Sequence, residues 1–457
     1  MCIKLTDEVV FILNRLNKNN YDAGIVGGCV RDFFMKKKPK DWDITTSAKP
    51  DEIKELFKEY KQIDVGLKHG TVMIIINNEG FEITSFRIDG EYSDFRRPNS
   101  VEFTNDIIED LKRRDFTQNA IFYSLKEGLI DPFNGVNDIK NKIIKSVLDP
   151  NKRFLEDPLR ILRGIRFASN LGFEIERETK DAMIRYAYLL NKISKERIAN
   201  EFLKTIKGRY APKIINEYFD IIKIFIPEIV PMRNFNQMNK YHIYDIFDHT
   251  IETMKYSDDL IIKLTMFFHD IGKVKSFTID ENNIGHFYNH SEISFIIAKK
   301  IFKRLKLASS PLINNLELKN ILELIKFHSL KINTNKKSIK KTISKLNGDL
   351  KQFERLLLVK KCDVCGKNPK IINLQMKELE ELEQIFLQIK NEQPVFCVKD
   401  LDINGHNLIN IGVKKGVIVG KILKKLQEEV LYDNLKNNKE VLLERSKEIH
   451  NCLKELK

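Results

Sequence analysis

Hydrophobic residues recur every three or four positions near the start of the chain. Those between residues 5 and 18 fall on one face of a predicted helix, which packs before the first strand. They are Val9, Ile12, Leu13 and Leu16. Later the pattern changes to short apolar runs, and residues 71–76 and 81–86 are predicted to be strands joined by a turn at 77–80. Residues 1–143 are therefore expected to mix helices with strands.

From residue 144 onward the pattern is helical. Residues 144–208 are predicted to form one helical domain, with helical periodicity from Lys152 to about Ile206. Several prolines make residues 209–240 irregular, and this segment is predicted to connect two parts of the chain. Two further helical domains are predicted, 241–366 and 367–457.

Composition narrows the class of protein. The 457 residues are 42% hydrophobic and 31% charged, which is typical of a folded globular chain of roughly two to four domains. No apolar run is long enough for a membrane span. The net charge of +14 suits a polyanionic partner such as nucleic acid, although an abundance of lysine also occurs on ordinary solvated surfaces. The six scattered cysteines and the absence of a signal-peptide pattern lead us to expect reduced thiols in the cytoplasm.

Residues 24–46 contain the first candidate chemistry. Ile25 and Val26 predict the end of a buried strand, and Gly27 and Gly28 then form a turn without Cβ atoms, which a phosphate can approach closely. A helix is predicted from Val30 to Met35. This arrangement favours the binding of an anion.

Two carboxylates follow the glycine turn. Asp41 and Asp43 flank Trp42 in a run predicted to be extended, so both should point to the same face. Mg²⁺ is commonly held by one or two carboxylates together with substrate phosphates. Each motif alone is common as an ordinary turn or a solvated edge, but together they predict transfer of a nucleotidyl group.

Gly27–Asp32 followed by Lys40–Asp43 resembles the class II tRNA nucleotidyltransferases (CCA-adding enzymes) and bacterial poly(A) polymerases of the DNA polymerase beta superfamily. The resemblance implies an α+β head with a mixed sheet, followed by all-α neck, HD and tail domains. It also implies tRNA, CTP and ATP as partners and Mg²⁺ as cofactor. In this interpretation Asp41 and Asp43 hold Mg²⁺, whereas Gly28 and Arg31 contact the triphosphate.

Three further segments of the head match the family pattern. Glu82 lies on the second predicted hairpin strand and is a candidate third catalytic carboxylate, although a strand Glu is often simply exposed. Arg114, in the Arg-Arg-Asp motif, suits neutralisation of a triphosphate. Residues 89–98 correspond to a flexible loop of the family that participates in the switch to terminal A. This loop favours full CCA addition over CC addition alone.

The segment 153–167 presents acidic and basic side chains on one predicted helix. Glu156, Asp157, Arg160 and Arg163 could simply form intrahelical ion pairs, each worth a few tenths of a kcal/mol. The segment also resembles the nucleobase-selecting motif of class II enzymes. That resemblance implies that Asp157 and Arg160 hydrogen-bond to the edge of C or A, with Arg163 and Arg166 in support.

A second candidate centre lies among the later histidines. His269 and Asp270 end an apolar run that Gly272 is expected to cap, which resembles an HD-type metal phosphohydrolase. His249, His269, Asp270 and Asp363 are the expected ligands of a second divalent metal. Single histidines on helices are usually structural, but His290 and His328 also fit as extra ligands or phosphate contacts. Cys362 and Cys365 lack a second pair at zinc spacing.

The sequence therefore predicts template-independent addition of CCA to tRNA, with accessory HD phosphohydrolase activity. Poly(A) addition and partial CC or A addition remain alternatives within the same chemistry. A metal phosphohydrolase with an RNA-binding head, or a non-catalytic RNA-binding protein, would belong to a different class. Nothing in the sequence assigns an oligomeric state.

Overall fold

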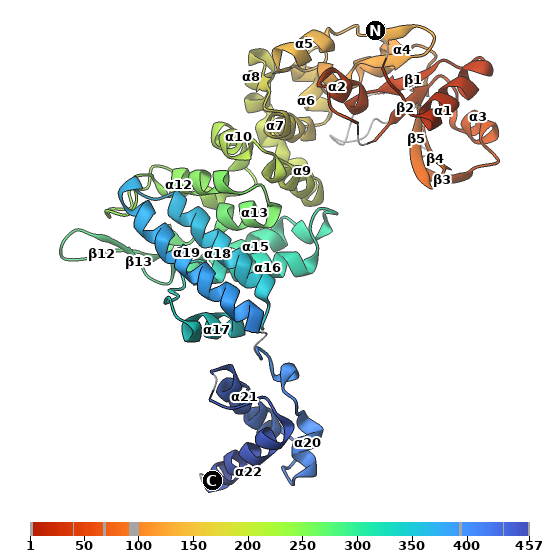
Figure 1. The fold of residues 1–457 in the computed structure, drawn as a ribbon. Helices are drawn as coiled ribbons and strands as arrows, with labels where there is room; N and C mark the ends of the chain where they lie inside the picture. Colours follow the sequence, from red (N-terminus) through yellow and green to blue (C-terminus); the bar gives the residue numbers. More distant parts are fainter. Residues whose placement is uncertain are drawn as a thin grey trace. The chain divides into compact units, whose positions relative to one another are not determined.

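The computed structural model describes residues 3–39, 41–66, 70–90, 100–392, 395–432 and 434–455 (Figure 1). The chain divides into two compact units. Unit 1 comprises Met1–Pro227 with Lys303–Leu312, and unit 2 comprises Glu228–Phe302 with Ile313–Lys457. Most of the loop predicted at 89–98 lies outside the described residues, as does Lys40.

A mixed sheet forms the base of unit 1, in the strand order β3-β4-β5-β2-β1-β8-β9. β2 and β5 are parallel, whereas all other neighbours in this sheet are antiparallel. Its strands are β1 (Ala23–Val26), β2 (Asp43–Thr46), β3 (Lys61–Gly66), β4 (Thr71–Ile76), β5 (Glu79–Ser85), β8 (Phe122–Ser124) and β9 (Gly128–Ile130). Two small pairs accompany it: β6 (Arg87–Asp89) with β7 (Val101–Phe103), and β10 (Ile143–Ile144) with β11 (Glu174–Ile175). The expected mixed α+β head is thereby confirmed.

Local sequence explains the first helix and the hairpin. The four apolar residues predicted to face the core from α1 (Asp7–Lys18) are all buried, and the Thr6 side chain caps its N-terminus. Asn77 and Asn78 connect β4 to β5 with φ of 51° and 66°. Asparagine tolerates this left-handed conformation, and two such residues make a tight hairpin turn. Both predictions are therefore confirmed, with a turn two residues shorter than expected.

The remaining helices of unit 1 cover the sheet and continue beyond it (Figure 1). They are α2 (Gly28–Phe34), α3 (Pro50–Leu56), α4 (Ile107–Lys112), α5 (Gly135–Asn141), α6 (Pro150–Glu156), α7 (Leu159–Leu171), α8 (Arg177–Tyr186), α9 (Lys195–Lys207), α10 (Ala211–Glu217) and α11 (Phe219–Ile222). Short 3₁₀ turns of unit 1 are η2 (Thr117–Asn119), η3 (Ala187–Lys192) and η6 (Leu307–Ser309), whereas η4 (Pro227–Met232) begins at Pro227 and continues into unit 2. Because α10 and α11 bury isoleucines, the segment 209–240 is more regular than its prolines suggested.

The prediction of unbroken helical structure from Lys152 to Ile206 is wrong. Asp157 adopts an extended conformation (φ −141°, ψ 97°) between α6 and α7. The cause is Pro158, since a proline disfavours the α conformation of the residue before it. Glu156 and Arg160 consequently lie on two different helices. Gly172 then ends α7 with a φ of 71°.

In the part of unit 2 that the structure describes, the regular elements are helical apart from the hairpin β12 (Phe277–Ile279) and β13 (Gly285–Phe287). Its helices are α12 (Ile246–Thr253), α13 (Leu260–Phe268), α14 (Lys273–Ser276), α15 (His290–Arg304), α16 (Asn315–Phe327), α17 (Lys336–Lys345), α18 (Leu350–Cys365), α19 (Pro369–Glu392), α20 (Gly405–Asn410), α21 (Val417–Leu431) and α22 (Lys439–Glu455), with 3₁₀ turns η5 (Met254–Tyr256) and η7 (Val398–Asp400). α13 packs against α12, α16 and α18. The tail from η7 onward has its own apolar core around Leu408 and Leu426. The predicted domain boundaries stay predictions.

Gly272 does not close the apolar helix, contrary to the sequence prediction. α13 ends at Phe268, and Gly272 has a φ of −86° at the start of α14. The glycine is needed for a different reason: a Cβ atom there would lie 2.5 Å from the backbone nitrogen of Ser294 on α15. The absence of a side chain therefore lets α15 approach the His269–Asp270 turn closely.

Candidate active site and metal centre

A pocket of about 860 Å³ in unit 1 brings together most of the predicted head residues. We call it the head pocket. It is lined by Gly27, Gly28, Arg31, Asp41, Asp43, Arg87, Asp89, Arg113, Arg114, Asp115, Asn119, Asp157, Leu159, Arg160, Arg163, Arg166, Phe167 and Arg197. Eight of these are arginines, so the pocket suits an anion of several charges. Every predicted head residue lines it except Glu82.

The glycine turn lies beside the carboxylates. Gly27 has a φ of +78°, and a Cβ atom there would lie 3.5 Å from Nη1 of Arg114 and 3.7 Å from Oδ2 of Asp43. β1 runs directly into this turn, and β2 pairs with β1 in antiparallel register. The sheet thus places the start of β2, where Asp43 lies, next to the backbone of the turn.

Asp41, Asp43 and Glu82 form an acidic edge on the sheet. Asp43 is the first residue of β2 and lies directly opposite Glu82 on β5, whereas Asp41 precedes the strand. Partial desolvation raises the pKa of Asp43, and the negative charge of Asp41 raises it further. Arg114 and Arg31 lower this pKa, but they do not cancel the increase. The pKa of Glu82 is raised by desolvation and by Asp43 and Asp41. These carboxylates repel one another, and their oxygens are suitable ligands for a divalent cation such as Mg²⁺.

Asp110 anchors two arginines of the head pocket. Its side chain is fully buried, with Oδ1 2.6 Å from Nη2 of Arg113 and Oδ2 3.1 Å from Nη2 of Arg114. Burial alone would raise the pKa of Asp110, but Arg114 and Arg113 outweigh it and lower the pKa. The sequence prediction missed this residue. The sequence does contain a signal for this contact: Arg113 and Arg114 follow Asp110 by three and four positions, a spacing at which side chains on a helix are neighbours.

Asp115 anchors a third arginine. Its Oδ2 lies 2.6 Å from Nη2 of Arg163, and its Oδ1 accepts a hydrogen bond from Asn119. Burial opposes ionisation, but Arg163 and the hydrogen bond from Asn119 hold the pKa of Asp115 at about 2. Arg166 lies 4.3 Å from the ring centre of Phe167, a cation–π contact. These contacts hold the guanidinium groups in place before any ligand arrives.

Asp157 and Arg160 both line the head pocket, but they do not pair with each other. Oδ2 of Asp157 lies 2.7 Å from Nη2 of Arg197 on α9, and Oδ1 accepts from the backbone of α7. Arg160 instead contacts Glu156 at 2.7 Å and donates to the carbonyl of Arg113 at 3.0 Å. Arg197 is a further residue that the sequence prediction missed, because it lies forty positions from Asp157 and no local motif marks it.

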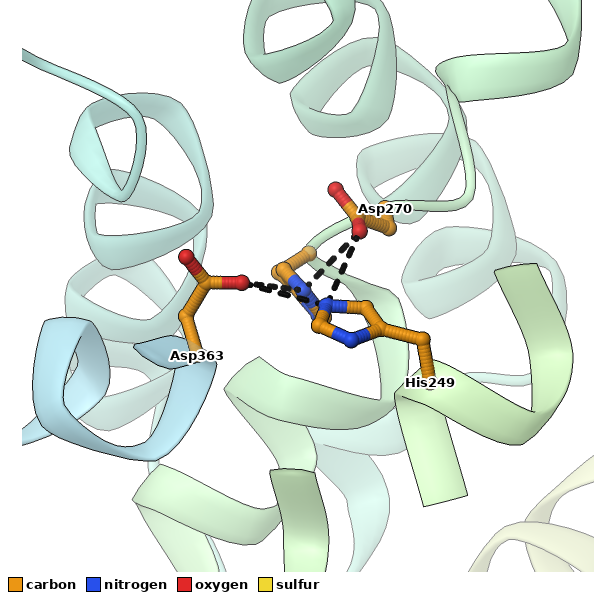
Figure 2. Close-up of side chains that lie close together, drawn as sticks. His249, Asp270 and Asp363 are labelled. Carbon is orange, nitrogen blue, oxygen red and sulfur yellow. Dashed lines mark hydrogen bonds and ion pairs between the residues drawn. The ribbon is translucent and has the colours of Figure 1, made fainter. Parts of the chain in front are cut away.

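Four side chains of unit 2, which we call the HD cluster, converge from three separate segments (Figure 2). They are His249 on α12, His269 and Asp270 after α13, and Asp363 on α18. Nε2 of His249 lies 3.1 Å from Oδ1 of Asp363, and Nε2 of His269 lies 3.1 Å from Oδ2 of Asp270. The structure thus brings together all four residues predicted to bind the second metal.

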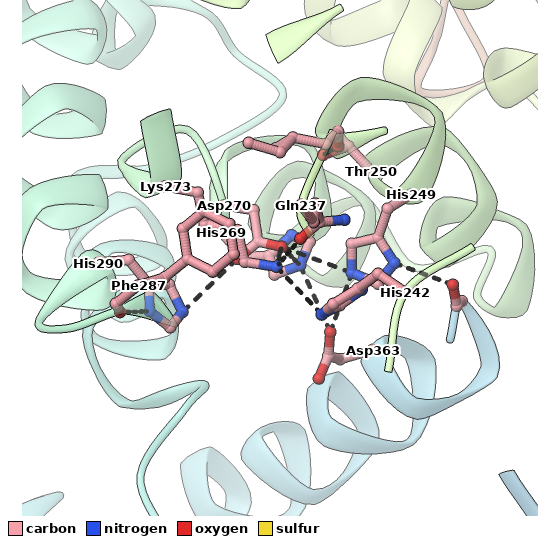
Figure 3. A network of polar contacts seen from close by, with 12 residues as sticks. Gln237, His242, His249, Thr250, His269, Asp270, Lys273, Phe287, His290 and Asp363 are labelled. Carbon is pink, nitrogen blue, oxygen red and sulfur yellow. Dashed lines mark hydrogen bonds and ion pairs between the residues drawn. The ribbon is translucent and has the colours of Figure 1, made fainter. Parts of the chain in front are cut away.

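The orientation of both histidines of the HD cluster is set by the backbone. Nδ1 of His249 lies 2.9 Å from the carbonyl oxygen of Gly366, and Nδ1 of His269 lies 2.7 Å from that of Met266. A carbonyl only accepts hydrogen bonds, so each Nδ1 donates to its carbonyl and each Nε2 is the ring nitrogen that faces the cluster (Figure 3). This is the usual arrangement of metal-binding histidines.

The two carboxylates of the HD cluster are ionised. Burial opposes this, but His269 and Lys273 lower the pKa of Asp270, and Lys367 and His249 lower that of Asp363. The pKa of His269 is raised to about 9 because Asp270 and Asp363 outweigh its burial. The cluster therefore attracts positive charge, and its two nitrogen and two carboxylate ligands fit a divalent transition metal.

Family models match most of the chain. Residues 23–145 match the poly A polymerase head domain, and residues 172–233 match the probable RNA and SrmB-binding site of polymerase A. Residues 246–366 match the HD domain, and residues 312–445 match the putative tRNA nucleotidyltransferase domain 2. Within the described residues, no helix has the length and apolar character needed to cross a membrane.

Known proteins resemble the chain over nearly its whole length or over a part of it. The CCA-adding enzyme of Ligilactobacillus salivarius is 32% identical over 441 residues, 96% of this chain and 95% of that protein. That of a Geobacillus species is 47% identical over 205 residues, 45% of this chain and 50% of that protein. The fold matches the Bacillus stearothermophilus CCA-adding enzyme in complex with CTP, with a TM-score of 0.73, 24% identity and full coverage of both chains. It also matches the Thermotoga maritima CCA-adding enzyme complexed with tRNA, with a TM-score of 0.56, 20% identity and coverage of 97% and 96%.

Proposed function

The chain belongs to the CCA-adding enzymes, and we propose that it adds C, C and A to the 3′ end of tRNA in the head pocket. The 3′ hydroxyl of tRNA attacks the α-phosphate of CTP or ATP, and pyrophosphate leaves. The observation that carries the proposal is one pocket that combines the glycine turn, Asp41 and Asp43, and arginines from several elements. Relatives with solved structures include complexes with CTP, ATP and tRNA, which supports the same partners here.

In this proposal Asp41 and Asp43 hold Mg²⁺, with Glu82 as a neighbouring carboxylate. The cation, when bound, offsets the charge of the triphosphate and of the leaving pyrophosphate. Gly28 lets the phosphates approach the backbone. Arg31 and Arg114 bind triphosphate oxygens, because a guanidinium pairs with phosphate through two parallel hydrogen bonds.

Base selection is assigned to the α6–α7 junction and α9. Asp157 offers carboxylate oxygens and Arg197 offers N–H donors at the same edge of the pocket. Such a pair can match the donor and acceptor edge of C or A without a nucleic-acid template. Arg160 lines the same pocket. Its contacts with Glu156 and with the carbonyl of Arg113 stabilise the conformation of the α6–α7 junction. Arg163 and Arg166 support the nucleotide from α7.

The experiment compares nucleotide incorporation by the wild-type protein and by Asp43→Asn. Purified protein is given tRNA that lacks its 3′ end, Mg²⁺ and labelled CTP. The variant should lose about 100-fold or more in rate, because an amide oxygen binds Mg²⁺ far less well than a carboxylate. Asp51→Asn is the matched control, since Asp51 is exposed in the first turn of α3. Equal rates for Asp43→Asn and the control would contradict the assignment.

The HD cluster supports a second function, metal-dependent hydrolysis of a phosphate ester. Water adds to phosphorus, the ester P–O bond breaks, and the proton passes to the leaving oxygen. Four converging ligands with oriented histidines support this proposal. We also propose a cytoplasmic location, because the cysteines among the described residues are free thiols.

A further inference from the structure

Three guanidinium groups lie around the ring of Phe167, which lines the head pocket. The guanidinium carbons of Arg31, Arg163 and Arg166 lie 5.5 Å, 5.8 Å and 4.3 Å from the ring centre. A cation within about 6 Å of an aromatic ring centre is attracted by the negative face of the ring. Arg31 belongs to α2, whereas the other two arginines belong to α7. One ring therefore holds cationic groups from two separate helices.

The ring of Phe167 is itself held in a fixed position. It meets the ring of Phe116 edge to face, with the ring centres 5.9 Å apart and the planes at 84°. Phe116 is fully buried and packs closely on α7, because a Cβ atom at Gly164 would lie 3.0 Å from its Cζ atom. Phe167 is only 9% exposed. Cation–π attraction is strongest where water is excluded in this way.

Each of the three arginines also pairs with a carboxylate at 3.0 Å or less. The pairs are Arg31 with Asp32, Arg163 with Asp115, and Arg166 with Glu201. Repulsion among the guanidinium groups persists despite these pairs: burial lowers the pKa of Arg166, and Arg163 and Arg31 lower it further against Glu201. The ring offsets this repulsion without a net negative charge. It therefore attracts the arginines without repelling an incoming phosphate.

We propose that Phe167 is a positioning residue for the phosphates of the nucleotide, because its ring holds Arg31, Arg163 and Arg166 in place before the nucleotide binds. The inference rests on the proposed binding of CTP and ATP in the head pocket and assigns that binding a further residue. Guanidinium groups that are already ordered lose little conformational freedom when they bind phosphate, so binding becomes tighter. A phenyl ring neither donates nor accepts a proton. Its loss should therefore weaken nucleotide binding and leave the rate of phosphoryl transfer nearly unchanged.

The test replaces Phe167 with phenylalanine that carries one, two or three fluorine atoms on the ring, introduced by genetic code expansion. Fluorine withdraws electrons from the ring face and weakens its attraction for cations, whereas the size and apolar character of the side chain change little. Addition of CTP to tRNA lacking its 3′ end is then measured. KM for CTP should rise with each fluorine, by about 10-fold over the series, and kcat should change by less than about 2-fold.

Phe122 is the matched control position. It is buried in the head and meets the ring of Phe86 edge to face, with the ring centres 6.0 Å apart. In the part of the chain that the structure describes, no arginine or lysine lies over its ring. Trifluorinated Phe122 should therefore keep the wild-type KM for CTP.

Phe167→Leu gives a second route, because it keeps an apolar side chain but removes the ring. It should raise KM for CTP at least as much as the trifluorinated ring does. Circular dichroism melting checks that each protein is folded. If the trifluorinated protein does not fold, the rise in KM from no fluorine to two still tests the inference.

The outcomes separate this inference from the proposed function. A KM that is constant or falls along the fluorine series would overturn the positioning role and make Phe167 a packing residue only. Titration calorimetry with inorganic triphosphate measures binding without turnover. If the wild-type protein adds no CTP, the proposed function fails, but a stepwise loss of triphosphate affinity along the series would still support the role of the ring. Equal triphosphate affinity along the series would overturn it.

Discussion

The ion pair between Asp115 and Arg163 leads to a prediction that combines stability with pH. Asp115→Asn keeps the size of the side chain but removes the charge that lies 2.6 Å from the guanidinium. An ordinary Asp side chain has a pKa of 3.8, whereas that of Asp115 is about 2. Since one pH unit corresponds to about 1.4 kcal/mol, the ionised carboxylate stabilises the folded head by about 2 kcal/mol at neutral pH.

The sign of the pH dependence follows from the lowered pKa. The stabilisation is fully present above the unfolded value of 3.8 and is lost as the pH falls through about 2. The difference in the free energy of unfolding between wild type and Asp115→Asn should therefore be about 2 kcal/mol at pH 7. It should shrink to about half of that at pH 3.

Urea unfolding followed by the fluorescence of Trp42 measures this difference. Trp42 is the single tryptophan in the sequence and lies in the head, so its signal reports on unit 1 rather than on unit 2. Asp22→Asn is the control, because the side chain of Asp22 pairs with Lys126 at the exposed surface and its replacement should change stability little. A difference that stays the same from pH 7 to pH 3 would refute the reasoning.

Three further predictions follow from the same geometry. Asp157→Ala should reduce the selectivity among CTP, ATP, UTP and GTP more than it reduces the rate of addition, because Arg197 loses its partner. Unchanged selectivity in assays with each nucleotide supplied singly would contradict this. His249→Ala should reduce metal retained by unit 2 at least about 10-fold and leave CTP incorporation intact, and a shared loss of both would argue against separate sites. Gly272→Ala should destabilise unit 2 by about 1–3 kcal/mol, since its Cβ would meet the backbone of Ser294; an unchanged thermal unfolding midpoint by calorimetry would contradict the close packing.

The sequence predicted those features of the fold that depend on residues close together in the chain. The family and the α+β head followed by helical regions were predicted and are confirmed by the comparisons and the fold. The buried face of α1 and the Asn77–Asn78 turn depend only on spacing and on backbone preferences of single residues. β3 was not predicted, because Lys61–Gly66 has few apolar residues and gains its order from pairing with β4.

The candidate sites show where sequence reasoning stops. Asp157 and Arg197 meet because α7 and α9 pack together, and no residue spacing encodes that contact. The sequence pattern placed Asp157 and Arg160 on one helix, which Pro158 breaks, and their joint role in base selection was implied by the family resemblance. His249 and Asp363 are 114 residues apart, and only the resemblance to HD domains linked them. The roles of all these residues stay predictions.

The most direct measurement of the central claim supplies wild-type protein with tRNA lacking its 3′ end, Mg²⁺, and CTP and ATP singly and together. Products are resolved at single-nucleotide length. The account predicts two residues of C with CTP alone and three nucleotides ending in A with both. A long A tail with ATP alone would indicate a poly(A) polymerase, and arrest after CC with both nucleotides would contradict full CCA addition.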